Sequence, residues 1–142
     1  MIRSIFAALI IPALVLLAPA HALAQAAPAR PSTVTAAIPA PSDRARQWLT
    51  LVDDGNYAQS WNEAGAAFKA RAKADAWAKQ AVALREPLGA VASRDLKSID
   101  LSQTQIAVVR YDSFFAHKIG AVETVTLSFE NGGWAVTGYD IK

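Results

Sequence analysis

The sequence predicts an α+β domain, in which about three N-terminal helices pack on one face of a curved four-stranded antiparallel sheet. Three observations support this. Between residues 42 and 85, apolar and aromatic side chains recur at helical spacing. After Gly89 the spacing becomes strand-like. The chain then ends in two alternating segments joined by Asn131-Gly132, a pair that accepts the positive φ angles of a type I′ hairpin turn.

The first helix is expected to begin at Ser42, whose hydroxyl can cap the free N–H groups of the first turn. Trp48, Leu51 and Val52 follow at positions that share one side of a helix. Gly55 is expected to end it.

Two further helices are predicted over residues 56–67 and 71–85. Trp61 and Trp77 are expected to point inward as core side chains. Pro87 stops the last helix, because the residue before a proline is pushed out of the helical region. Residues 90–101 then form an edge strand and residues 104–116 a strand rich in β-branched and aromatic side chains.

The hairpin at Asn131-Gly132 predicts a register for the last two strands. With a two-residue loop, Phe129 lies opposite Trp134 and Glu123 lies opposite Asp140. These four side chains share one face, the core face. Two carboxylates placed directly opposite each other are destabilising, so a cation is expected near them.

The expected cation is Arg110. If the turn at residues 116–120 has an even number of residues, Arg110 and Asp112 share a face with Glu123; an odd number turns Arg110 to the opposite face. Arg110, Asp112, Glu123 and Asp140 are therefore the candidate ligand-binding cluster, with Glu123 as a candidate catalytic base. A buried ion-pair network that fixes strand register is the favoured alternative.

The other face of the predicted sheet carries apolar and aromatic side chains. A patch of this kind often marks an interface. Tyr111, Phe115, Tyr139 and Ile141 are its candidate residues, and a homodimer through this outer face is one expectation. A covering loop, or the N-terminal segment folding back, is the alternative.

The N-terminus resembles an export signal. Residues 1–24 contain Arg3, an apolar run and an Ala-x-Ala site, which is typical of a cleaved signal peptide. Residues 25–41 are rich in alanine and proline and predict a disordered tether before a single domain at 42–142. We expect an exported protein, periplasmic or secreted, with no transmembrane segment in the mature chain.

Composition excludes several classes of chemistry. There is no cysteine, so disulfides, thiolate ligands and thiol nucleophiles are absent. His117 is the one histidine after the signal and falls in a predicted loop, so we expect no metal site. Phosphate-binding glycine motifs are missing, and we expect no cofactor. Removal of Arg3 leaves 13 basic against 12 acidic groups, which argues against a nucleic-acid partner.

Three separated blocks carry a family resemblance: WLTLVDDGNYAQSW, REPLGAVASRDLKS and FFAHKIGAVETVTLSFENGGWAVTGYDIK. Together they resemble the domain of unknown function 4019, found in bacterial exported proteins, over residues 45–142. More distantly, the last strands are similar to nuclear-transport-factor-2-like (cystatin-like) cone folds, which implies a pocket between helices and sheet. Some members of that fold are isomerases or dehydratases with an Asp–His or Tyr–Asp pair, but His117 lies outside any predicted strand, so such a pair does not transfer.

The sequence therefore predicts a non-catalytic binding or assembly module. The alternative is a small-pocket enzyme of the isomerase or dehydratase type that uses Glu123 with Arg110. A structural part of the cell envelope without a small ligand is a third hypothesis. Fold resemblance alone does not decide between them.

Overall fold

The computed structural model describes residues 37–142. The elements, in chain order, are α1 (Pro41–Asp53), α2 (Tyr57–Asn62), α3 (Ala66–Arg71), α4 (Ala74–Arg85), a 3-10 turn η1 (Glu86–Leu88), β1 (Val91–Gln103), β2 (Ile106–Phe115), β3 (Lys118–Glu130) and β4 (Gly133–Ile141). The predicted signal peptide and most of the predicted tether lie outside the described residues.

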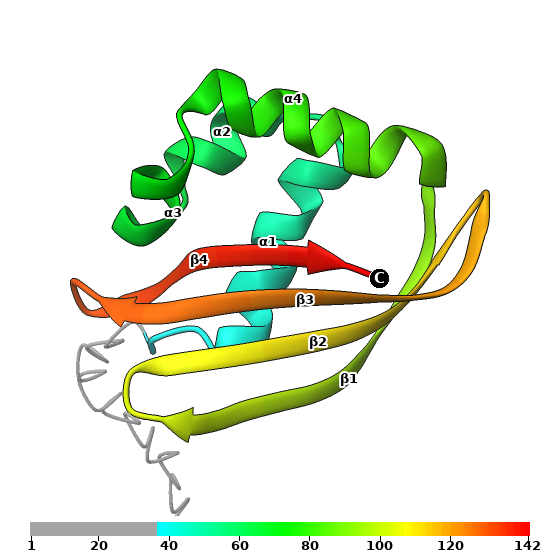
Figure 1. Ribbon diagram of the computed structural model, residues 1–142. Coiled ribbons are helices and arrows are strands. Elements are labelled where there is room, and N and C mark those ends of the chain that lie inside the picture. Colours follow the sequence, from blue (N-terminus) through cyan, green and yellow to red (C-terminus); the bar gives the residue numbers. More distant parts are fainter. Residues whose placement is uncertain (1–36) are drawn as a thin grey trace, which may run out of the picture. The chain divides into compact units, whose positions relative to one another are not determined.

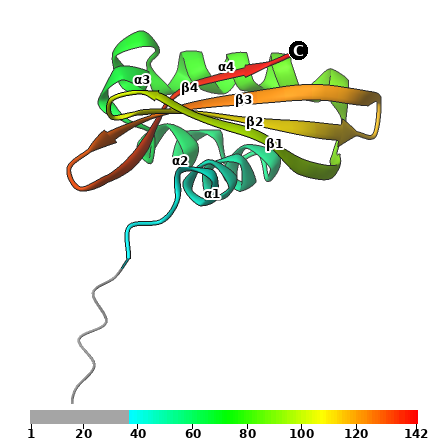
Figure 2. The ribbon, with the colours of Figure 1, turned by 90° about the horizontal axis from the view of Figure 1, so that it is seen from below.

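The four strands form one open antiparallel sheet in the order β1-β2-β3-β4. Figure 1 shows this sheet as twisted and curved, with α1 crossing behind it and α4 on its β4 side. Helix α1 contacts all four strands, and Figure 2 shows it running along one face of the sheet. Helix α4 packs mainly against α2. The predicted α+β class is confirmed.

Two details of the predicted helices are wrong. Helix α1 begins at Pro41, with Ala40 as its N-cap and no side-chain cap from Ser42. Proline suits the first helical position because its missing N–H would be unpaired there. The helix predicted over 56–67 is divided at Gly65, whose N–H donates to the carbonyl of Val136 on β4 at 2.8 Å. A Cβ on Gly65 would lie 3.1 Å from the Ala135 Cβ and 3.2 Å from the Thr137 Cγ2 on β4, closer than ordinary van der Waals contact, so glycine favours this close approach to β4.

The core is built around Trp48 on α1, which has no exposed surface. Its ring centroid lies 5.8 Å from that of Phe68, 5.7 Å from that of Trp77 and 5.6 Å from that of Tyr139. The Trp48 indole N–H donates to the Ser60 carbonyl at 2.7 Å. Helices α1, α3 and α4 thus meet strand β4 in one aromatic cluster, and α2 joins it through the Ser60 carbonyl.

The hairpin register is as predicted near the turn and differs beyond it. Phe129 lies opposite Trp134, as predicted, and Leu127 lies opposite Val136. An irregularity then shifts the pairing by one residue, because Thr137 is an extra residue in β4. Glu123 consequently lies opposite Ile141, so the predicted Glu123–Asp140 pairing is wrong.

The β2–β3 register gives the second correction. Arg110 lies opposite Thr124 and Tyr111 opposite Glu123, which is the alternative in which Arg110 faces away from Glu123.

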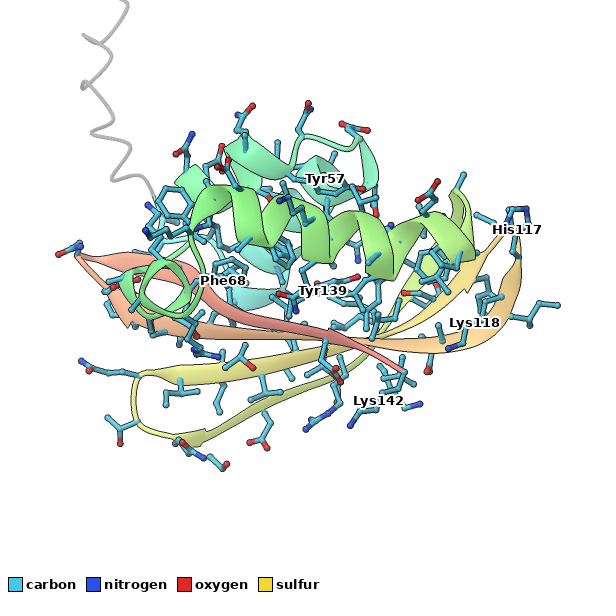
Figure 3. All side chains as sticks on the ribbon, turned by 45° about the horizontal axis from the view of Figure 1, so that its top comes forward. Tyr57, Phe68, His117, Lys118, Tyr139 and Lys142 are labelled. Carbon is cyan, nitrogen blue, oxygen red and sulfur yellow. The ribbon has the colours of Figure 1, made fainter. Side chains whose placement is uncertain are left out.

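The core face of β2 therefore carries Tyr111 and Phe115, which are 0% and 3% exposed. The exposed aromatic face predicted from Tyr111, Phe115, Tyr139 and Ile141 is wrong, since Tyr139 also turns inward and Ile141 is partly buried. His117 lies exposed in the β2–β3 turn, as predicted (Figure 3).

Candidate functional site: a buried ionic cluster and the hollow beside it

Glu123 on β3 is a fully buried carboxylate that accepts four hydrogen bonds. Its Oε1 accepts from Arg85 Nη1 and from the Tyr139 hydroxyl, both at 2.7 Å. Its Oε2 accepts from Arg94 Nε at 2.6 Å and from Ser113 Oγ at 2.5 Å. Two oxygens offer about four lone-pair sites, so the hydrogen-bonding capacity of Glu123 is filled.

A second carboxylate, Asp53, completes the cluster from the last residue of α1. Arg94 Nη1 donates to its Oδ2 at 2.7 Å and Arg94 Nη2 to its Oδ1 at 3.0 Å, a two-pronged contact. Arg85 Nη2 also donates to Asp53 Oδ1. Two guanidinium groups thus bridge two carboxylates, and the four charges balance. The term ionic cluster is used below for Asp53, Arg85, Arg94, Ser113, Glu123 and Tyr139.

The ionic cluster joins most of the fold. Asp53 comes from α1, Arg85 from α4 and Arg94 from β1, while Ser113, Glu123 and Tyr139 come from β2, β3 and β4. Arg85 is the last residue of α4, where the helix dipole favours a cation. Its guanidinium carbon lies 4.7 Å from the ring centroid of Phe115, which is a cation–π contact.

The protonation states follow from these contacts. Burial alone raises the pKa of Glu123, but the hydrogen bonds and charge of Arg94, with the hydroxyls of Ser113 and Tyr139, lower it below its usual value. Burial, together with the Glu123 charge, raises the pKa of Tyr139 well above that of a free phenol. At neutral pH the cluster therefore contains an ionised Glu123 and a protonated Tyr139.

Of the four residues predicted to form the polar cluster, the structure places only Glu123 in it. Arg110 lies on the opposite sheet face. Asp112 pairs with Lys97 at 2.7 Å on the surface, and the Asp140 side chain is 59% exposed beside Lys142. The expectation that Arg110 neutralises Glu123 is wrong.

The charged residues that sequence reasoning missed are Arg85, Arg94 and Asp53. Arg85 and Arg94 lie 38 and 29 positions before Glu123 in the chain, so no local pattern connects them. One signal was available: Asp53 and Arg85 both fall at the ends of predicted helices.

A hollow of about 380 Å³ opens beside the ionic cluster. It is called the acidic hollow below, and its lining is Val52, Asp53, Tyr57, Val82, Arg85, Glu86, Gly89, Ala90 and Val91. Asp53 and Arg85 belong to both the hollow and the cluster, whereas Glu123 does not reach the hollow. Tyr57, labelled in Figure 3, is the first residue of α2.

Residues 37–142 contain neither a metal-binding cluster nor a helix that could span a membrane. No group of three or more histidine, aspartate or glutamate side chains has metal-binding geometry there. None of the helices in this range is long and apolar enough to cross a membrane.

Comparison with known proteins gives one family. A family model described as "Protein of unknown function (DUF4019)" matches residues 44–139, a range that includes every member of the ionic cluster. The curated proteins contain no match to the chain.

Proposed function

Since the chain belongs to the DUF4019 family, whose description assigns no function, we propose that it is an exported, non-catalytic binding module whose ligand enters the acidic hollow. The proposed ligand class is a small organic cation with an apolar body. Export is supported by the signal-like sequence of residues 1–24.

The state of Glu123 supports a non-catalytic role. A general base must reach the proton that it removes, either directly or through one water. Glu123 has no exposed surface, its oxygens are occupied by four donors, and its pKa is lowered rather than raised toward neutrality. In the isomerase or dehydratase alternative, Arg110 is the partner of Glu123. Arg110 lies on the opposite face of the sheet, so no contact favours that alternative.

The observation that carries the ligand class is the chemistry of the acidic hollow. Val52, Val82 and Val91 supply apolar wall, and Val82 is 42% exposed although it is a large aliphatic residue. Arg85 already donates to Glu123, Tyr139 and Asp53, so its charge is neutralised. The carboxylate of Glu86 has no hydrogen bond or ion pair within the described part of the chain. The hollow therefore offers apolar contact and one free negative charge.

The expected result is that the full-length chain binds phenethylamine at the acidic hollow and does not bind phenylacetate there. Titration followed by amide chemical shifts should move signals of Val52, Val82 and Val91. Glu86→Gln should weaken phenethylamine binding roughly tenfold, as expected for loss of one charged contact.

The matched control is Asp75→Asn, which removes the same charge from the first turn of α4 outside the hollow. It should leave the affinity unchanged. Equal binding of phenethylamine and phenylacetate, shifts elsewhere in the protein, or equal effects of the two variants would contradict the assignment.

A further inference from the structure

A second cavity lies between α3, α4 and β4, and Tyr139 forms part of its wall. Its volume is about 120 Å³. Three aromatic rings line it: Phe68 and Trp77 meet edge to face with centroids 4.9 Å apart, and Trp77 meets Tyr139 at 90° with centroids 6.2 Å apart. Figure 3 shows Phe68 and Tyr139 on the same side of α4. These rings are fixed by the core, so the walls of the cavity are preformed.

The charged side chain at this cavity is Arg71, the last residue of α3. Its Nη1 would lie 3.8 Å from a side-chain carbon on Gly138, so the guanidinium lies over β4 where that strand has no side chain. Across residues 37–142, the Arg71 guanidinium makes no hydrogen bond and no ion pair. This contrasts with Arg44, Arg85 and Arg94, each of which is paired with a carboxylate.

A second polar group lies at the mouth. Gln80 on α4 also lines the cavity and is exposed to solvent. No acidic side chain is among the lining residues. A positive charge with an amide beside it, above aromatic walls, is complementary to a carboxylate attached to an apolar body.

We propose that this cavity, called the Arg71 cavity, binds a small carboxylic acid. The carboxylate pairs with the Arg71 guanidinium at the mouth, and the apolar body lies against Phe68, Trp77 and Tyr139. A dry cavity of about 150 Å³ holds benzene, so this smaller one fits a body of about four carbon atoms. The site is separate from the acidic hollow and takes a ligand of opposite charge, so it stands whether or not the hollow binds a cation.

The test titrates butyrate into the full-length chain and follows the indole fluorescence together with the amide shifts of Ala72 and Gly138. Butyrate is expected to bind with shifts at these two residues. Butyramide, which has nearly the same shape without the charge, should bind roughly tenfold more weakly or not at all.

Two variants separate the site from general surface charge. Arg71→Gln should weaken butyrate binding roughly tenfold, because it removes the charged donor. Lys79→Gln removes an equal charge from an exposed position on α4 outside the cavity and should change the affinity less than about twofold. Arg71 is exposed and unpaired, so Arg71→Gln should keep the wild-type melting temperature, and this is measured alongside.

Three outcomes would overturn the proposal. They are equal affinities for butyrate and butyramide, equal effects of Arg71→Gln and Lys79→Gln, and the absence of shifts at Ala72 and Gly138. None of these results bears on phenethylamine binding at the acidic hollow, so failure of one site is distinguishable from failure of the other.

Discussion

Glu123→Ala is expected to lower the free energy of unfolding by about 3–5 kcal/mol, the cost of breaking a buried ion pair by removing one partner. Without the carboxylate, Arg85 and Arg94 keep their charges in a site where their side chains are 6% and 9% exposed. The carboxylate of Asp53 is then the one negative charge left in the cluster beside two guanidinium groups. Ser113 and Tyr139 also lose the acceptor of their hydroxyl hydrogens.

Urea unfolding followed by circular dichroism measures this loss. The matched control is Asp112→Ala, which breaks the exposed ion pair with Lys97 and should cost only about 0–1 kcal/mol. If the two variants lost the same small amount of stability, the ionic cluster would not be a major support of the fold.

Trp48→Ala is expected to cost about 3–5 kcal/mol, the range for removing a large aromatic side chain from a packed core. Trp48 has no exposed surface and its ring packs against Phe68, Trp77 and Tyr139. The substitution also leaves the Ser60 carbonyl without its indole donor. The effect should reach the ionic cluster, because Tyr139 belongs to both.

The comparison for this variant is Trp134→Ala, measured by the same urea unfolding. Trp134 is only partly buried and packs edge to face on Phe129 near the β3–β4 turn. Its removal should therefore cost clearly less than removal of Trp48. A larger loss of unfolding free energy from Trp134→Ala than from Trp48→Ala would contradict the placement of the core around Trp48.

Local patterns predicted much of the fold. Strand alternation and the Asn131-Gly132 turn led to the correct pairing of Phe129 with Trp134, because a two-residue loop fixes the register next to it. The change of periodicity near Gly89 likewise marks the passage from helices to strands. These features depend on residues close together in the chain, which a sequence displays directly.

The candidate site could be predicted only in part, because single residues decide which face a strand presents. Thr137 adds one residue to β4, and a one-residue shift turns every later side chain to the other face. That shift moves Tyr139 onto the face of Glu123. The length of the β2–β3 turn likewise decides which face each β2 side chain occupies, and it places Arg110 on the face opposite Glu123.

The cations of the site were missed for a different reason. Arg85 ends a helix and Arg94 lies on the edge strand, and tertiary packing alone brings both to Glu123. A carboxylate expected on a core face correctly indicated that a cation must be near. It did not indicate which of the many arginines would supply it.

The most direct test of the account is a double-mutant cycle between Arg94 and Glu123. The unfolding free energies of Arg94→Ala, Glu123→Ala and the double variant give the coupling between the two side chains. We expect a coupling of roughly 2 kcal/mol or more, because the contact is buried and Arg94 also binds Asp53. A coupling within about 0.5 kcal/mol of zero, as for sites that do not interact, would contradict the claim that this ionic cluster holds the helices and the sheet together.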